Sequence, residues 1–457
     1  MSEILKLVYN ACDPYEAATS QYYLDCGEAR GESALTDRFL GHLALANDYL
    51  CFLFSGHVGC GKSSELARLR DRLKETKPNH PSYFPILLDV SDYLDDFDTS
   101  LTDILLAIVT ELAQTLRAEL NIEIKDAYFT KRINEVKEFF LSDVEINEGE
   151  LSLPLAKLKI QRLKRDPDAR KRVRTALEPR LLTMLEAMNL VFDEARVAIK
   201  KFSDQMGRQP YADLVLILDN LEKIRGFEGQ PGGFNSQREF FLERYAQLTG
   251  LKAHVIYTVP LRLARSVDGP QLEQRYGPLF VLPMIKVISR DAGQPYEPGL
   301  ECLRNILQKR LGGHGIPEVF DADALEFLLK YSGGHVRNLM TFVQSACTYT
   351  DTTPITLIAA QRAVQQTVRT YSTAILESHW GKLAELDLSA VKKIDNGDSD
   401  FLVMLENLSI LEYVNGGSEG SFEAAEPWCA VNPVVRELQK FKSGVRDLSN
   451  VREADER

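Results

Sequence analysis

The chain has 457 residues, of which 44% are hydrophobic and 26% charged, and its formal net charge at pH 7 is −12. A chain of this length is expected to form about three domains with ample apolar core. The acidic balance argues against a protein that coats nucleic acid or anionic membranes along its whole surface, because such binding depends on a positive field. A local basic patch is still compatible with this composition.

The seven cysteines are scattered, odd in number and without a C-x-x-C pair, which favours a reducing compartment over a disulfide framework. The N-terminal residues lack the basic start and the apolar run of a secretory signal. No segment approaches the roughly 18 consecutive apolar residues of a membrane helix. We therefore expect a cytoplasmic protein that does not contact a membrane.

The most informative stretch runs from Leu50 to Arg72, where a β-type apolar run leads through a glycine-rich turn into a charged helix. It contains a complete G-x-x-x-x-G-K-S phosphate loop. Glycines let backbone N–H groups crowd round a phosphate chain, and the helix that follows points its positive dipole end there. Lys62 is predicted to reach the β and γ phosphates of ATP, and Ser63 to bind Mg²⁺. The predicted nucleotide-binding residues of the loop are Gly56, Gly59, Cys60, Gly61, Lys62, Ser63 and Ser64.

A second buried strand is predicted in the segment from Asp213 to Ile224, where five apolar residues end at Asp219. The carboxyl end of a buried parallel strand faces the phosphate loop in such sheets. Asp219 is therefore predicted to hold Mg²⁺, directly or through water, because phosphoryl transfer needs a metal that bridges the phosphates. The next residue is Asn220, and the next acid is Glu222.

The phosphate loop and the Asp219-Asn220-Leu221-Glu222 sequence resemble those of AAA+ ATPases, in particular the STAND and origin-recognition types, over about residues 25 to 345. AAA+ motors place a glutamate directly after the metal-binding aspartate to orient the attacking water. Asn220 occupies that position here, so the resemblance implies slow, regulatory turnover. Glu222 is then the leading candidate for positioning the water.

The same resemblance implies three further contacts to ATP. Arg30, before the helix that precedes the phosphate loop, corresponds to the element that contacts adenine. Thr258 ends the predicted strand beside the metal-binding strand, which is the place of sensor 1. Arg337 follows the glycine pair Gly333-Gly334 and resembles the sensor 2 arginine, which approaches the γ phosphate from the lid.

An arginine that acts on the site of a neighbouring subunit is also implied. Arg275 precedes the fifth predicted strand, the position from which AAA+ proteins extend an arginine finger. Arg262, Arg265 and Arg244 compete with it for this role, and an ordinary surface arginine is an equally good interpretation of each. This assignment implies a homo-oligomer.

The strand pattern predicts an α/β protein with a parallel sheet, and the resemblance implies the P-loop NTPase (AAA+/ASCE) class with the strand order 5-1-4-3-2. We expect a helical insertion, a helical lid and a C-terminal winged-helix-like domain. The predicted strands lie near 50–55, 83–90, 213–219, 253–259 and 279–287. The predicted domains are 1–290 (core, with the insertion at 121–210), 291–376 (lid), 377–445 (winged-helix-like) and 446–457 (disordered tail).

Two segments bear on nucleic-acid binding. The basic stretch 158–174 is interpreted first as the solvated face of the helical insertion, with nucleic acid or an acidic partner as the alternatives. The presumed reading helix of the winged-helix-like domain, within 398–410, is acidic and apolar. Major-groove readers usually present Arg, Lys, Asn or Gln, so we favour protein contact over DNA reading.

Together these features predict a slowly hydrolysing, STAND-like switch that binds ATP and Mg²⁺ and controls a separately encoded effector. By its resemblance to bacterial conflict systems, the switch would act in defence against phage. Two alternatives stay open. One is a DNA-binding AAA+ loader or transposition-type regulator, and the other is a structural ATP binder that does not hydrolyse its ligand.

Overall fold

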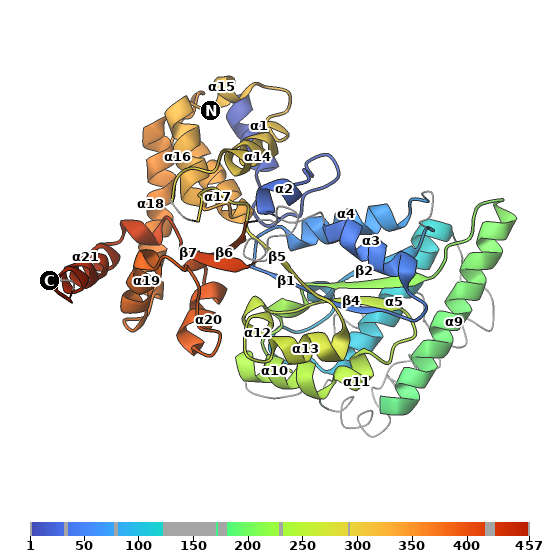
Figure 1. Ribbon diagram of the computed structural model, residues 1–457. Coiled ribbons are helices and arrows are strands. Elements are labelled where there is room, and N and C mark those ends of the chain that lie inside the picture. The colour runs from blue at the N-terminus through green and yellow to red at the C-terminus, as the bar shows by residue number, and fades with distance from the viewer. Residues whose placement is uncertain are drawn as a thin grey trace.

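The computed structural model describes residues 2–31, 35–76, 81–121, 171, 181–227, 232–290, 293–415 and 426–455. Its centre is a parallel sheet of five strands in the order β2-β3-β4-β1-β5 (Figure 1). The strands are β1 (Cys51–Gly56), β2 (Phe84–Asp89), β3 (Leu214–Asp219), β4 (His254–Thr258) and β5 (Leu279–Leu282). Read from the other edge this is 5-1-4-3-2, so the predicted fold class and strand order are confirmed.

Both faces of the sheet are buried, which explains why its strands are continuous apolar runs. On β3, Val215 and Ile217 belong to one buried cluster, and Leu216 and Leu218 belong to another on the opposite face. The first face is covered by α3 (Leu35–Leu45) and α4 (Lys62–Leu73). The second is covered by α5 (Leu101–Leu120), α9 (Leu181–Gln205), α10 (Phe234–Glu243), α11 (Tyr245–Leu248), α12 (Leu261–Ala264) and α13 (Gly269–Tyr276).

A helical lid follows the sheet. It consists of α14 (Glu297–Gln308), α15 (Ile316–Val319), α16 (Ala322–Ser332), α17 (Val336–Cys347) and α18 (Leu357–Ala374). The N-terminal helices α1 (Glu3–Ala11) and α2 (Gly27–Arg30) pack on α17 and α14. Leu5 and Val8 of α1 are buried in the hydrophobic cluster that contains the lid helices. The predicted domain boundaries instead place them in the ATPase core domain, 1–290. The predicted domain boundaries otherwise stay a prediction.

The C-terminal domain, residues 377–455, contains α19 (His379–Leu388), α20 (Ser399–Glu406), an antiparallel hairpin of β6 (Ile410–Val414) and β7 (Pro427–Val431), and α21 (Gln439–Asp455). Helices followed by a hairpin are the arrangement expected of a winged-helix-like domain. Residues 446–455, expected to be a disordered tail, continue α21 instead. The reason is that α21 packs along α19, with Phe441 buried and Val445 packed against the same cluster, which the polar composition of the tail does not reveal.

The basic stretch 158–174 lies outside the described residues, apart from Lys171. Neither interpretation of that stretch is therefore tested. Within the described ranges, none of the helices combines the length and the apolar character needed to cross a bilayer.

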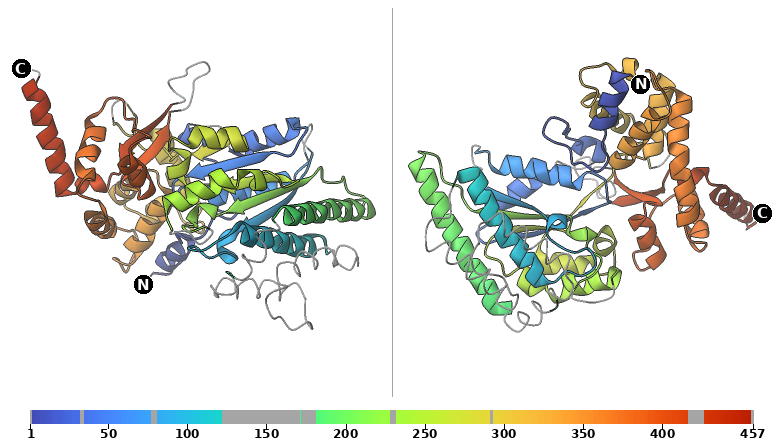
Figure 2. Two further views of the ribbon diagram at one scale, coloured as in Figure 1. Left: turned by 90° about the horizontal axis from the view of Figure 1, so that it is seen from below. Right: turned by 180° about the vertical axis from the view of Figure 1, so that it is seen from behind.

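The hairpin of the C-terminal domain lies beside one end of the sheet (Figure 2). Leu411, Tyr413 and Trp428 share one buried cluster with Phe54 of β1. Trp428 is 1% exposed and stacks on Tyr413, with ring centroids 4.7 Å apart. The hairpin and the sheet thus share a hydrophobic core.

Replacing Trp428 by alanine is expected to reduce the free energy of unfolding by about 3–5 kcal/mol, since a buried aromatic ring is lost and a cavity remains. Urea unfolding followed by circular dichroism measures this. Phe97→Ala is the matched control, because Phe97 is 65% exposed, and its midpoint should stay close to that of the wild type. Equal midpoints for Trp428→Ala and the wild type would show that the hairpin does not share the core.

Candidate functional site

A cavity of about 330 Å³ lies at the carboxyl ends of the strands, where open α/β sheets bind their ligands. Its floor is the loop that joins β1 to α4. Asp89 at the end of β2 and Asp219 at the end of β3 line one side, and lid residues Arg310 and Arg337 line another. Segment 13–18, which precedes α2, completes the wall.

The loop between β1 and α4 has the geometry of a phosphate loop. Gly59 and Gly61 have φ values of 87° and 110°, which side-chain-bearing residues rarely adopt. At Gly59 a Cβ atom would lie 2.8 Å from the Cβ of Arg337, so the lid also excludes a side chain there. α4 begins at Lys62, and its first N–H groups carry the positive end of the helix dipole.

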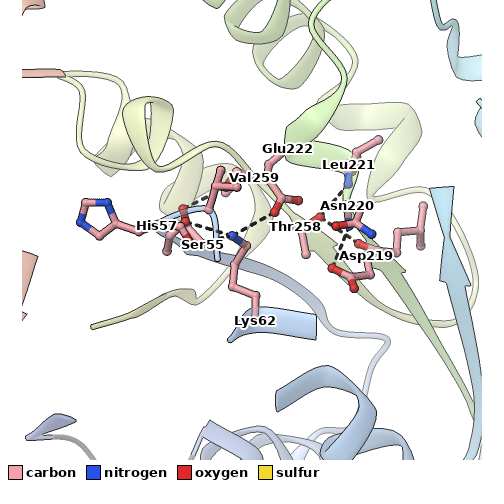
Figure 3. Close-up of polar contacts among 12 residues, drawn as sticks. Ser55, His57, Lys62, Asp219, Asn220, Leu221, Glu222, Thr258 and Val259 are labelled. Atoms are coloured by element: carbon pink, nitrogen blue, oxygen red, sulfur yellow. Dashed lines mark hydrogen bonds and ion pairs between the residues drawn. The ribbon is translucent and has the colours of Figure 1, made fainter. Parts of the chain in front are cut away.

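Lys62 is buried and makes three polar contacts at its ammonium group (Figure 3). Its Nζ donates to the carbonyls of Gly56, at 3.0 Å, and His57, at 3.1 Å. It also forms an ion pair with Glu222 Oε1 at 2.9 Å, with both side chains 4% exposed. An ammonium has three donors, so Lys62 is fully engaged within the protein.

The carboxylates of the site have shifted pKa values. Burial and the nearby charge of Glu222 raise the pKa of Asp219 to about 6, although hydrogen bonds from Ser63 and Asn220 act in the opposite direction. Burial is the largest influence on Glu222 and would raise its pKa, but the charge of Lys62 and the hydrogen bonds to the carboxylate together outweigh burial and hold that pKa below its usual value. The pair of Lys62 and Glu222 is therefore charged at neutral pH.

Ser63 and Asp219 fit the predicted magnesium site. The Ser63 hydroxyl is hydrogen-bonded to the Asp219 carboxylate, so the two oxygen ligands are adjacent. Mg²⁺ commonly takes one or two carboxylates and completes its octahedron with water and phosphate oxygens. Among the described residues no group of three His, Cys, Asp or Glu side chains could hold a metal, and this oxygen pair is the kind of partial site that a phosphate-bound Mg²⁺ uses.

Asn220 has a structural role in the turn that follows β3. Its φ is 65°, a left-handed conformation that asparagine tolerates better than most residues, and it precedes the short helix η3 (Leu221–Lys223). Its amide donates to Asp89 Oδ2 at 2.8 Å. An amide held in this way is no general base, and η3 carries Glu222 to the cavity in its place.

The predicted sensor residue Thr258 lies at the tip of β4, beside β3. It is fully buried. Its hydroxyl donates to the carbonyl of Leu218 and accepts from the N–H of Leu221 at 2.9 Å (Figure 3). Here Thr258 fastens the turn that carries Glu222, and it is not among the described residues that line the cavity. Its role toward the γ phosphate stays a prediction.

Arg30 lies behind the phosphate loop instead of in the cavity. Its side chain is 5% exposed, and it donates to the carbonyls of Cys60, at 2.8 Å, and Pro283. The Cys60 side chain is buried in the apolar cluster beneath the loop. In this structure Arg30 supports the loop, and contact with adenine stays a prediction.

The arginine-finger candidates lie away from the cavity in their own subunit. Arg275 on α13 donates to the carbonyl of Leu242, and its guanidinium lies 4.6 Å from the centroid of the Tyr245 ring. Two of its competitors contact the C-terminal domain, Arg262 through Glu406 and Arg265 through Glu412. Whether Arg275 or Arg244 acts on a neighbouring subunit stays a prediction.

Segment 13–18 is a part of the site that sequence reasoning missed. The Arg337 Nε donates to the carbonyl of Pro14 at 3.0 Å, and its guanidinium lies 5.8 Å from the centroid of the Tyr15 ring. Ser64 Oγ accepts from the N–H of Ala18 at 2.9 Å. Arg337 does line the cavity, as predicted, but its guanidinium binds this segment. No sequence motif marks the segment, because its position depends on a residue more than 300 places away.

Asp89 and Arg310 also line the cavity without having been predicted. Asp89 ends a buried strand, as Asp219 does, so the same pattern would have identified it. Arg310 follows α14, is 7% exposed, and donates to the carbonyl of Ile306 at 3.0 Å. Nothing in the sequence around Arg310 distinguishes it from other lid arginines.

Two buried histidines connect the phosphate loop to its surroundings, His57 from within the loop and His335 from the lid. His335 accepts at Nδ1 from the N–H of Asn338, so its Nε2–H donates to the carbonyl of Val58 at 2.7 Å. His57 accepts at Nε2 from the N–H of Glu412 at 3.0 Å, so its Nδ1–H donates to the carbonyl of Leu405 at 3.1 Å. Each ring is therefore held as one neutral tautomer.

No protein-family model matches the chain, and no curated protein matches it. Its fold overlaps with that of several solved structures. They include Drosophila ORC bound to DNA (11% identity, TM-score 0.39, 97% of this chain and 92% of that one), Cdc6p from Pyrobaculum aerophilum (9%, 0.37, 96% and 98%) and the Aeropyrum pernix ORC1 protein in complex with DNA (11%, 0.35, 93% and 96%). Similarity at this level does not establish a shared activity or partner.

Because both histidines are buried in the neutral form, we expect the protein to lose stability in mild acid. Burial, followed by the electrostatic effects of His335, Lys62 and Arg265, lowers the pKa of His57 to about 3, although its hydrogen bond to Leu405 acts in the opposite direction. Burial and the charge of Arg337 lower that of His335 to about 4, despite its bond to Val58. In the unfolded chain both titrate near 6.5, so the unfolded state binds more protons as the pH falls below that value.

Between pH 7 and pH 5 each histidine should therefore remove about 2 kcal/mol from the free energy of unfolding. Urea unfolding at both pH values measures the loss. The variant His57→Phe keeps a ring but cannot be protonated, so its loss should be smaller than that of the wild type by about 2 kcal/mol. An equal loss in both proteins would mean that His57 is not neutral in the folded state.

Proposed function

We propose that this protein is an ATP-binding switch that hydrolyses its ligand slowly and assembles with copies of itself when ATP is bound. The observation that supports it most is one cavity that brings together the phosphate-loop residues Lys62 and Ser63, the metal-ligand candidate Asp219 and the lid arginine Arg337. ATP supplies the phosphate chain and Mg²⁺ the bridging charge that phosphoryl transfer requires.

The residues of the site divide this work. The N–H groups at the start of α4 and the Lys62 ammonium would hold the phosphates. Ser63 and Asp219 would hold Mg²⁺. Arg337 would leave the carbonyl of Pro14 and contact the nucleotide from the lid, so the lid would have different contacts with and without ATP. Differential contacts of this kind are what a nucleotide switch needs.

Two features support slow turnover. Asn220 cannot act as a base, and Glu222 is tied to Lys62 by the buried ion pair. When Lys62 moves to the phosphates, Glu222 is released, and its second oxygen, Oε2, is buried without a hydrogen-bond partner in the described part of the chain. That oxygen is the candidate acceptor for a proton of the attacking water.

The more specific part of the proposed function rests only on the resemblance to known ATPase families. It includes the STAND type, control of a separately encoded effector and action in bacterial defence against phage. A DNA-binding loader has no specific observation in its favour, because the basic stretch 158–174 lies outside the described residues and α20 carries no arginine, lysine or glutamine.

Assembly tests the switch. With ATP and Mg²⁺ the wild type is expected to increase in mass in size-exclusion chromatography with light scattering, while Lys62→Ala stays at the mass of the nucleotide-free protein because it cannot hold the phosphates. Lys74→Ala, which removes a partly exposed ion pair between the residue that follows α4 and Glu119, is the matched control and should assemble. If wild-type mass responds to duplex DNA but not to ATP, the loader is the better interpretation. No response to either overturns the switch.

Glu222→Gln tests the water-positioning role. Loss of the carboxylate should reduce turnover at least about 100-fold, measured as phosphate release. ATP affinity should be retained or increased, since the phosphates of ATP no longer compete with the Glu222 carboxylate for the Lys62 ammonium. Glu273→Gln, on the exposed face of α13, should match the wild type. Wild-type protein that binds ATP without releasing phosphate would instead be a structural ATP binder.

A further inference from the structure

The side chain of His57, in the phosphate loop, is bound by the C-terminal domain through both ring nitrogens. One partner is the carbonyl of Leu405 on α20, and the other is the N–H of Glu412 on β6. These residues lie 348 and 355 positions away in the sequence. The ring is 2% exposed, so water does not compete for either bond.

The main chain of the same residue contacts the nucleotide-binding lysine. The carbonyl of His57 accepts from Lys62 Nζ at 3.1 Å. His57 therefore connects the group that would bind the phosphates to the C-terminal domain within a single residue. The next two residues of the loop are held by the lid, Val58 through His335 and Gly59 through the N–H of Arg337 at 3.2 Å.

The contact around His57 is an extensive docking surface between the core and the C-terminal domain. Glu412 is 3% exposed and forms two bonds of 2.7 Å with Arg265, which follows α12. Its carbonyl accepts from the N–H of Met284 at 3.0 Å. α20 packs on α12, and Arg262 lies 3.6 Å from Glu406 at the end of α20. Helix α20, the predicted reading helix, thus contacts protein, namely the ATPase core domain of the same chain.

We propose that His57 couples nucleotide binding at the phosphate loop to the docking of α20 and β6, so that ATP changes the position or mobility of the C-terminal domain. This inference rests on the proposed function, since it presupposes that ATP binds at Lys62. To that function it adds the C-terminal domain as the part that responds to bound ATP, and His57 as the residue that links the two.

The mechanism follows from the competition for Lys62. When Lys62 turns to the phosphates, the carbonyls of Gly56 and His57 lose their donor and the loop adjusts around the ligand. The ring of His57 moves with its main chain, and its two bonds to α20 and β6 must lengthen or carry these elements along. By thermodynamic linkage, the factor by which ATP changes the docking equilibrium equals the factor by which docking changes ATP affinity, so a variant that undocks the domain should shift ATP affinity by up to that factor.

Hydrogen exchange measured by mass spectrometry tests the coupling on the full chain, with saturating ATP and Mg²⁺ or without nucleotide. Amides of α20 and β6 in the wild type are expected to change their exchange rates at least about fivefold on ATP binding, the lower end of typical couplings. In His57→Phe, which keeps a ring without polar atoms, the ATP-dependent change should fall below twofold. Nucleotide occupancy is checked separately with a fluorescent ATP analogue.

A wild type that binds ATP without any change in α20 and β6 overturns the proposal, and so does an unchanged response in His57→Phe. A wild type that does not bind ATP contradicts the proposed function itself, so the two failures are distinguishable. If His57→Phe does not fold or cannot be saturated, Glu412→Gln decides, because it weakens the pair with Arg265 and leaves the loop intact.

Glu412→Gln should shift ATP affinity at least about fivefold, and a shift below twofold overturns the coupling. Glu377→Gln is the matched control. It makes the same carboxylate-to-amide change in the same domain, in an exposed ion pair with Lys440 whose side chains are 81% and 61% exposed. Its ATP affinity should equal that of the wild type.

Discussion

A buried ammonium group needs a full set of partners, and much of this site is organised around that need of Lys62. Taking a charge out of water is costly unless it is paired and hydrogen-bonded. Two carbonyls of the phosphate loop and the carboxylate of Glu222 satisfy it in this structure. The same contacts bend the loop around Lys62 and place Glu222 beside Asp219. A ligand with phosphates would compete for a lysine that is already satisfied, and this competition links binding to a rearrangement.

The loop is held from both sides because three parts of the chain meet there. The sheet supplies the turn after β1, the lid binds the loop through His335 and Arg337, and the C-terminal domain binds it through His57. The hairpin β6-β7 shares its apolar cluster with β1. A displacement of the loop therefore meets rigid, well-packed neighbours, and packed cores respond to displacement by discrete shifts more than by gradual deformation.

Three side chains that were predicted to contact ATP are hydrogen-bonded to groups of the protein in this structure. Arg337 lies at the cavity as the motif indicates, yet its guanidinium binds Pro14. Thr258 reaches the tip of the strand beside β3 but fastens the turn that carries Glu222. Arg30 supports the loop from behind. In each case the motif identifies the neighbourhood of a polar side chain, and the final hydrogen bonds depend on which buried carbonyl or N–H group lacks a partner nearby.

Apart from the strand order, which the resemblance to AAA+ ATPases implied, the sequence by itself determined the α/β class, the five strands, the phosphate loop and the metal-ligand candidates Ser63 and Asp219. These follow from short contiguous patterns, because apolar runs, glycine spacing and residues at strand ends act through neighbours along the chain. Only the tertiary structure decided that segment 13–18 lines the cavity, that Glu222 pairs with Lys62, and that His57 reaches α20 and β6. Such contacts join residues far apart in the sequence, and they arise from packing and from the need to satisfy buried polar groups, which no local pattern encodes.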